Sequence, residues 1–163
     1  MVRRRAPDLR TAGSDLNRPR RVFVIFNPAS GRGRGARRID TYRRLLEERL
    51  PGVEFGFTEG PGHERDLAEE AVAAGFDVVA AAGGDGTWSN VADRVVACGH
   101  GRVAFAMLPN GTGNDFGRNL GFRPADPEHA VDALVRGHTV RVDVGHLESP
   151  SWSEHDPTRV EPR

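Results

Sequence analysis

The sequence predicts an α/β fold in which an open, mostly parallel sheet forms the middle of three layers, with helices on both faces. Short apolar runs alternate with segments of helical periodicity along the chain, and such alternation builds parallel sheets that helices cover on both sides. The apolar runs are continuous, as expected of strands buried on both faces. Glycine-rich stretches follow several of these runs, at the place where a doubly wound sheet binds its ligand.

The expected strands are short runs of β-branched, aromatic or small apolar residues. The clearest is Val22 to Phe26, which contains no polar residue and is predicted to be a buried strand. A weaker strand is expected at 53–58. Further strands are expected at 78–81, 103–108 and 139–144.

Helices are predicted between these strands from apolar residues that recur on one helical face. The first is expected at 36–50, and its apolar face consists of Ile39, Tyr42, Leu46 and Leu50. A second helix is expected from the spacing of Leu67, Ala71, Val72 and Phe76. The third has the clearest pattern, at Trp88, Val91, Ala92, Val95 and Val96. A fourth is expected around 129–136.

The composition narrows the classes of protein. The chain has 163 residues, enough for one domain, and its formal net charge is zero. No interleaving of aromatic and basic residues indicates a nucleic-acid surface. The single cysteine, Cys98, excludes an intrachain disulfide and any cysteine-based metal site. Because no apolar run is long enough to span a bilayer and no signal-peptide core is present, we expect a cytoplasmic protein.

Both ends of the sequence differ from the middle. Residues 1–20 are polar and rich in arginine, and we expect a disordered basic leader there. Such a leader is attracted to an anionic membrane surface. The alternative is a leader without a function, which would have the same composition. Residues 148–163 show no pattern and are expected to be a disordered tail. The predicted domain therefore spans 21–147.

The first glycine-rich loop runs from Asn27 to Gly35, between a strand and a helix. Glycines let the backbone approach an anion, and the next helix adds its positive end. The loop is not a Walker A motif, because the chain contains no lysine. Arg32 or Arg34 is the candidate for the positive charge. Taken alone, the loop also fits a flexible turn.

The second loop, Gly83 to Thr87, joins a buried strand directly to the clearest helix. Its glycines permit a tight turn, and Thr87 is expected to cap the helix. Asp85 would project near the phosphate position, where a carboxylate is favourable if Mg²⁺ or its waters lie between the two.

The third loop runs from Leu108 to Phe116 and again follows a strand. It offers a hydroxyl, two amides and a carboxylate within a few residues. Asn114 or Asp115 also fits the simpler role of a helix cap.

Three such loops at three strand ends predict one shared phosphate crevice. Together, Asn27-Pro28-x-Ser30-Gly31, Gly83 to Thr87 and Leu108 to Phe116 resemble the catalytic domain of diacylglycerol kinases. The same domain occurs in sphingosine, ceramide and bacterial lipid kinases. The order and spacing match from Arg21 to about Gly145. The middle motif alone also suits NAD kinases and phosphofructokinases, whereas the first and third motifs favour the lipid kinases.

The resemblance implies a role for each matched residue. It implies ATP contacts for Asn27, Pro28, Ser30, Gly31, Thr58, Gly83, Gly84, Asp85, Gly86, Thr87, Thr112 and Asn114. Catalytic roles are implied for Asp85 and Asp115. Together with Asp143, these two carboxylates would organise magnesium and water. By sequence alone, Thr58 and Asp143 read as a strand-end threonine and an exposed strand acid.

The sequence departs from the family pattern in two places. After the middle motif the family usually has a hydrophobic residue and then Asn-Glu, whereas here Trp88 is followed by Ser89 and Asn90. The family also continues into a β-sandwich that helps to bind the lipid and carries the general base. We expect that domain to be missing here. The tail contains three acids, Glu148, Glu154 and Glu161, but nothing fixes them within hydrogen-bond reach of the acceptor, where a general base must lie.

The resemblance therefore predicts a magnesium-dependent and ATP-dependent lipid kinase domain, which acts on an acceptor such as diacylglycerol at the inner membrane face. The alternatives are a truncated or split ATP-binding module without catalysis and, less favoured, an NAD kinase. A partner chain or self-association would replace the missing domain. Apolar surface exposed there predicts marginal stability or self-association.

Overall fold

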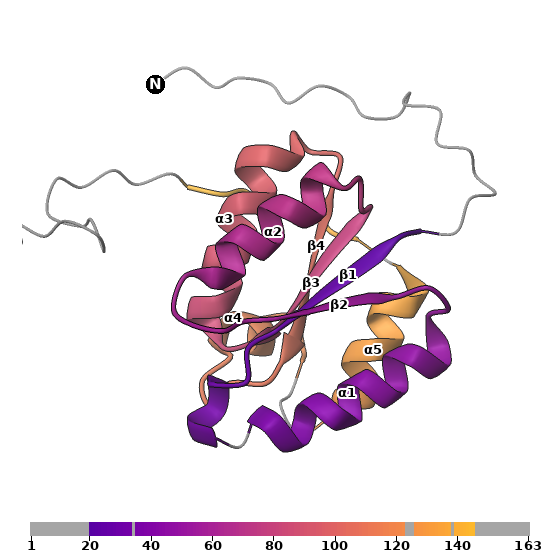
Figure 1. Ribbon diagram of the computed structural model, residues 1–163, viewed down its shortest axis with the longest axis vertical. Helices are drawn as coiled ribbons and strands as arrows, with labels where there is room; N and C mark the ends of the chain where they lie inside the picture. The colour runs from indigo at the N-terminus through magenta and orange to yellow at the C-terminus, as the bar shows by residue number, and fades with distance from the viewer. Residues whose placement is uncertain (1–19, 34, 123–125, 138, 146–163) are drawn as a thin grey trace, which may run out of the picture.

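A computed structural model describes residues 20–33, 35–122, 126–137 and 139–145. They form one parallel sheet with the strand order β2-β1-β3-β4 (Figure 1). The strands are β1 (Val22–Phe26), β2 (Glu54–Phe57), β3 (Val78–Gly83) and β4 (Ala104–Pro109). The helices are η2 (Ser30–Gly33), α1 (Gly35–Arg49), α2 (His63–Ala73), α3 (Asp85–Gly99), α4 (Asp115–Asn119) and α5 (Pro127–Arg136). The predicted fold class is confirmed.

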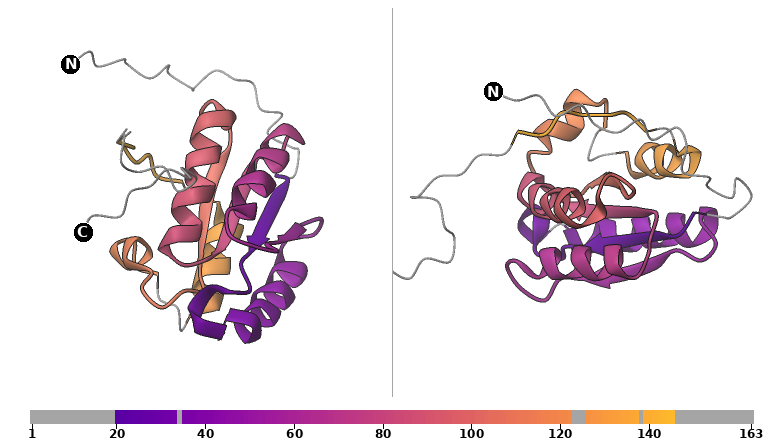
Figure 2. Two further views of the ribbon diagram at one scale, coloured as in Figure 1. Left: turned by 60° about the vertical axis from the view of Figure 1, so that its left-hand side comes forward. Right: turned by 90° about the horizontal axis from the view of Figure 1, so that it is seen from above.

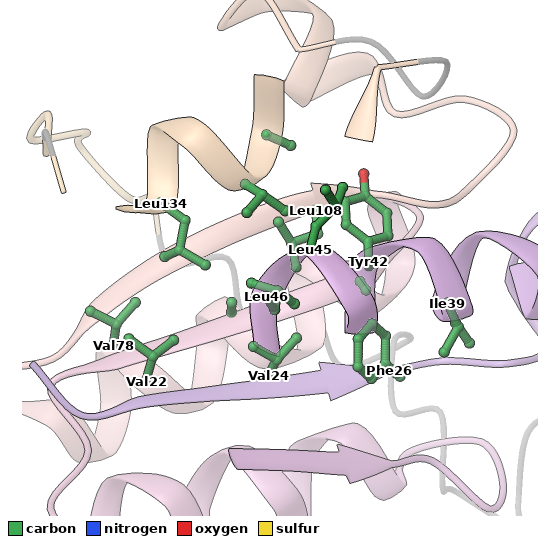
Figure 3. Packing of buried hydrophobic residues seen from close by; sticks show 14 residues of the cluster. Val22, Val24, Phe26, Ile39, Tyr42, Leu45, Leu46, Val78, Leu108 and Leu134 are labelled. Carbon is green, nitrogen blue, oxygen red and sulfur yellow. The ribbon is translucent and has the colours of Figure 1, made fainter. Parts of the chain in front are cut away.

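The sheet lies between two layers of helices (Figure 2). Successive residues of β1 point to opposite faces, so Val24 and Phe26 join one core and Ile25 joins the other. Helices α1 and α5 cover the first face, where Tyr42 and Leu46 pack over β1 (Figure 3). Helices α2 and α3 cover the second face. Every residue of β3 is buried, which explains its continuous apolar sequence.

The expected last strand is wrong. Residues 139–145 lie in no helix or strand and are exposed. Arg20, which precedes β1, donates hydrogen bonds to the carbonyls of Val135 and Gly137 at the end of α5. The segment after α5 therefore starts at the amino end of the sheet. Its alternating valines have the pattern of a strand, but a strand needs a neighbour for its backbone groups, and the described residues provide none.

Candidate functional site

The three predicted loops meet at the carboxyl ends of β1, β3 and β4. β1 and β3 are neighbours in the sheet, but the helices that follow them lie on opposite faces, because α1 covers one face and α3 the other. This is the topological switch point, where doubly wound sheets leave a crevice for ligands. The structure thus brings the first two glycine-rich loops to one place.

Asn27 joins the first loop to the second. Its backbone N–H donates to the carbonyl of Ala82 at 3.0 Å. Its side-chain amide donates to Thr87 Oγ1 at 2.9 Å, and its Oδ1 accepts from the N–H of Ala29 at 3.0 Å. The side chain is thus engaged within the protein and holds the loop in shape.

Thr87 does not cap helix α3, so that expectation is wrong. The cap position belongs to Gly84, which has an extended backbone, and Thr87 lies in the first turn. Its side chain is buried, and its hydroxyl oxygen accepts a hydrogen bond from the side-chain amide of Asn27. A Cβ at Gly83 would lie 2.6 Å from the Cβ of Thr87, so position 83 must be glycine for the turn to close.

Asn110, which the sequence analysis did not select, ties all three loops together. Its N–H donates to the carbonyl of Gly83 at 2.9 Å, and its amide donates to Ser30 Oγ at 3.1 Å. The buried hydroxyl of Tyr42 donates to the neighbouring carbonyl of Pro109 at 3.0 Å. No local signal marks position 110, because its importance comes from its complete burial between loops distant in sequence.

Asn114 is held in a left-handed conformation with φ 56°, which asparagine tolerates better than most residues. Its backbone occupies the cap of α4, but its side chain makes no cap bond. The amide instead donates to the carbonyl of Gly83 at 3.0 Å, and the side chain is fully buried. The expected side-chain cap is therefore wrong for Asn114, and Asp115 is already inside the helix.

Asp85 and Asp115 share one small space. A Cβ built on Gly113 would lie 2.9 Å from Asp85 Oδ2 and 3.9 Å from Asp115 Oδ2. Both carboxylates are exposed, and the N–H of Phe116 donates to Asp85 Oδ1 at 3.4 Å. Exposed carboxylate oxygens around a position without a side chain suit a hydrated magnesium ion.

Of the other predicted residues, some lie next to the three loops and some do not. Thr58 extends the pairing of β2, since its N–H donates to the carbonyl of Phe26 at 2.9 Å, one residue before Asn27. Pro28 and Thr112 are exposed on the first and third loops, and Gly86 is exposed in the first turn of α3. Asp143 lies in the exposed segment after α5, and no contact within the described chain joins it to Asp85 or Asp115. Arg34 and the side chain of Arg32 lie outside the described residues.

Asn90, where the sequence departs from the expected Asn-Glu pair, contacts a carboxylate of another helix. Its amide donates to Glu64 Oε1 of α2 at 2.6 Å. A carboxylate therefore lies next to position 90 after all, but it comes from the neighbouring helix.

The arrangement suits a polyphosphate with a divalent cation. The first turn of α3, a helix of 15 residues, presents N–H groups and the positive end of the helix dipole. The hydroxyl of Ser30 donates to the carbonyl of Asn27 at 2.8 Å, and the hydroxyl of Thr112 is exposed on the third loop. Phosphate oxygens need such donors, and the carboxylate pair needs a cation. Across the part of the chain that the structure describes, no helix is both long and apolar enough to cross a membrane.

Comparisons with known proteins agree with this chemistry. Residues 21–147 match the family described as "Diacylglycerol kinase catalytic domain". A diacylglycerol kinase of Staphylococcus epidermidis is 34% identical over 135 residues, which cover 78% of this chain and 40% of the relative. One of Staphylococcus saprophyticus is 35% identical over 137 residues, which cover 80% and 42%. The crystal structure of a putative diacylglycerol kinase from Bacillus anthracis has a TM-score of 0.64 and 26% identity, covering 72% of this chain and 42% of that one. The matching region thus spans about 40% of the curated relatives' length.

Proposed function

The chain belongs to the diacylglycerol kinase catalytic domain family, and on this premise we propose that it is the nucleotide-binding part of a lipid kinase. The reaction is transfer of the γ-phosphoryl group of ATP to a lipid hydroxyl such as that of diacylglycerol. The observation that carries the proposal is the meeting of three phosphate-type loops at the switch point, with Asp85 and Asp115 beside them.

ATP binds with its phosphates against the second loop and the first turn of α3. The backbone N–H groups there and the hydroxyl of Thr112 donate to phosphate oxygens, whereas the hydroxyl of Ser30 donates to the carbonyl of Asn27 at 2.8 Å and holds the first loop in shape. Asn27 and Thr87 act indirectly, because their mutual hydrogen bond keeps the first two loops in register. Phosphoryl transfer depends mainly on such positioning and on neutralisation of charge.

Asp85 and Asp115 are the residues that hold magnesium, directly or through water. The fit rests on the space that both carboxylates border at Gly113 and on the preference of Mg²⁺ for oxygen ligands. When bound, the ion neutralises charge on the phosphates. Asp143, which the resemblance adds to this set, lies in the segment after α5, and we do not include it.

The relatives are named diacylglycerol kinases, so a lipid hydroxyl at a membrane surface is the acceptor that we propose. The tail acids Glu148, Glu154 and Glu161, which no sequence feature fixes where a general base must lie, are outside the described residues.

The test is transfer of label from γ-labelled ATP to diacylglycerol and sphingosine in micelles, with NAD in a parallel reaction. Binding of Mg·ATP is measured by calorimetry on the same samples. We expect binding and label in the lipid, and a loss of at least about 100-fold in transfer for Asp85→Asn, in line with the loss of one electrostatic contact at a reacting centre. Circular dichroism checks that the variant is folded.

The other outcomes separate the alternatives. Binding of ATP by folded protein without any transfer favours an ATP-binding module without catalysis. Label in NAD favours an NAD kinase. A folded chain that binds no nucleotide contradicts the proposal.

A further inference from the structure

A polar network lies between helices α2 and α3 and includes a buried carboxylate. Glu64, in the first turn of α2, is only 5% exposed. The side-chain amide of Asn90 donates to Glu64 Oε1 at 2.6 Å, and Arg65 Nη1 donates to Asn90 Oδ1 at 2.9 Å. Two consecutive residues of α2 therefore engage both ends of one amide on α3.

The network continues outward. Arg65 Nη2 lies 2.5 Å from Asp93 Oδ2, and Arg94 also donates to Asp93. These contacts, first the hydrogen bond from Arg94 and then the nearby guanidinium charges, lower the pKa of the Asp93 carboxyl despite partial burial. Arg65 is thereby held in place to orient Asn90.

Burial of Glu64 needs a compensating interaction, because a buried charge is costly unless it is paired or hydrogen-bonded. Two features on α2 and α3 compensate. The amide of Asn90 satisfies one carboxylate oxygen, and the first turn of α2 provides the positive end of a helix dipole. Glutamate is rarely found at such low exposure without a specific partner.

The network links two parts of the candidate site. On one side, the loop 59–62 folds onto the first turn of α2: the N–H of Arg65 donates to the carbonyl of Gly62, and the N–H of Glu59 donates to His63 Nδ1. That loop begins directly after Thr58. Loop 59–62, together with Arg65, lines an open cavity of about 670 Å³, so a shift of this turn reshapes the surface next to Thr58.

On the other side, Asn90 lies on α3 three residues after Thr87. Thr87 in turn holds Asn27 through its hydroxyl. The contact between Glu64 and Asn90 is thus a bridge between the Thr58 side of the crevice and the loop Gly83 to Thr87. Side by side, α2 and α3 run along the same face of the sheet (Figure 1).

We propose that Glu64, Asn90 and Arg65 form a latch that sets the spacing between the Thr58 loop and the Gly83–Thr87 loop for nucleotide binding. Glu64 and Asn90 are positioning residues, since they act through the two loops. The inference rests on the proposed function, because one of its two readouts is the affinity for Mg·ATP, whereas the coupling between positions 64 and 90 is measured without nucleotide.

The experiment compares five variants and one control with the wild-type protein. One of the five, Glu64→Asn, is the single change that completes the double-mutant cycle with Asn90→Glu and the exchanged variant. Glu64→Ala removes the acceptor, and Glu64→Gln keeps a hydrogen-bond acceptor without the charge. Asn90→Glu places two carboxylates side by side, which is unfavourable in a buried place. The exchange Glu64→Asn/Asn90→Glu moves the carboxylate to α3, next to Arg65. Glu70→Ala, at an exposed position of α2, is the matched control.

Two readouts are taken. Urea unfolding without nucleotide measures the coupling between positions 64 and 90. Calorimetry with Mg·ATP, at a temperature where every variant is at least about nine-tenths folded, measures Kd. We expect about a tenfold rise in Kd for Glu64→Ala and for Asn90→Glu, and a smaller rise for Glu64→Gln. In the exchanged variant, the increase in log Kd should be at most about half of that for Asn90→Glu alone. Effects of this size are typical of coupled neighbours.

The result that overturns the latch is a Kd for Glu64→Ala and Glu64→Gln equal to that of the Glu70→Ala control, or effects that simply add in the exchanged variant. Where Glu64→Ala does not fold, Glu64→Gln and the exchanged variant decide by the same criteria. Failure of the proposed function can be distinguished from failure of the latch. If the proposed function is wrong, the wild-type protein binds no ATP, and the unfolding data still show whether positions 64 and 90 are coupled.

Discussion

At the scale of single residues, the glycines of the second and third loops are not equivalent. Gly111 and Gly84 lie back to back, and a Cβ on Gly111 would come within 2.5 Å of the Cα of Gly84. Neither backbone can move without disturbing Asn110 or Asn114. A Cβ on Gly86 would meet nothing within 4 Å, and Gly86 lies in the first turn of α3.

We therefore expect opposite effects of two alanine substitutions on thermal stability. Gly111→Ala lowers the melting temperature by several degrees, because the backbones of two loops must separate. Gly86→Ala leaves it unchanged or raises it, since alanine is favoured over glycine in a helix by up to about 1 kcal/mol. Differential scanning calorimetry on both variants makes the comparison. Equal losses would show that close backbone approach is not what requires Gly111.

Tyr42 supports the third loop from the core and is the only tyrosine in the chain. Burial raises the pKa of its phenol well above the ordinary value, and this outweighs the opposing charge of Arg38. Because the raised pKa belongs to the folded state, the stabilisation is complete below the ordinary tyrosine pKa of about 10 and is lost as pH rises above it.

The absorbance of phenolate near 295 nm reports on this one group. We expect no ionisation in the folded protein at pH 10 to 11, and a rise only as the protein unfolds. Tyr42→Phe should lower the free energy of unfolding at pH 7 by about 1 kcal/mol, the usual contribution of one hydrogen bond, and should remove part of the alkaline loss of stability. A normal titration near pH 10 in folded protein would contradict the burial of the hydroxyl.

At the scale of elements, two adjacent arginines hold helices on opposite faces of the sheet. Arg20 reaches the carbonyls at the end of α5. Arg21 donates to the carbonyl of Ala74 at the end of α2 at 2.8 Å and lies over the ring of Phe76, 4.1 Å from its centroid. Its backbone N–H also donates to Asp77. Cations near helix carboxyl ends are favourable.

Arg21→Ala should lower the free energy of unfolding by about 1 kcal/mol, because it removes a charged hydrogen bond and a cation–π contact that are partly exposed. The matched control is Arg44→Ala, at an arginine whose ion pair with Glu48 is 3.9 Å long and exposed. That change should cost no more than about 0.5 kcal/mol. Urea unfolding compares the two variants, and similar values would rule out a special role for Arg21.

At the scale of the whole molecule, the segment after α5 exposes apolar side chains. Val140, Val142 and Val144 are 74%, 52% and 69% exposed, and they alternate as in a strand without a neighbour. An exposed alternating segment of this kind is a template for pairing with another chain.

We expect concentration-dependent self-association, measured by sedimentation velocity between low and high micromolar protein. Replacing all three valines with threonine keeps the β-branched shape but reduces the apolar surface, and should shift the protein toward the monomer. Val96→Thr, at an exposed valine of α3, should have little effect. A wild-type protein that stays monomeric over the whole range would contradict this expectation.

The fold class and the meeting of the three glycine-rich loops could both be predicted from the sequence alone. Apolar runs such as Val22 to Phe26 report burial on both faces, and clusters of glycine after them report turns that only glycine permits. Both are local properties, so they can be recognised without knowledge of neighbours in space. They correctly predicted that the loops after β1, β3 and β4 meet. In the structure, Asp85 and Asp115 are the first residues of the helices that follow two of these loops.

The side chains that pair across the fold could not be predicted from the sequence. Asn27 with Thr87 and Asn110 with Ser30 are 60 and 80 residues apart in the sequence, and the partner of Glu64 lies on a different helix. The same reason explains the failed strand at 139–144. Its alternation is local, whereas a strand exists only beside another strand. Hydrogen-bond partners depend on which elements become neighbours, and sheet order, rather than any pattern within one segment, determines that.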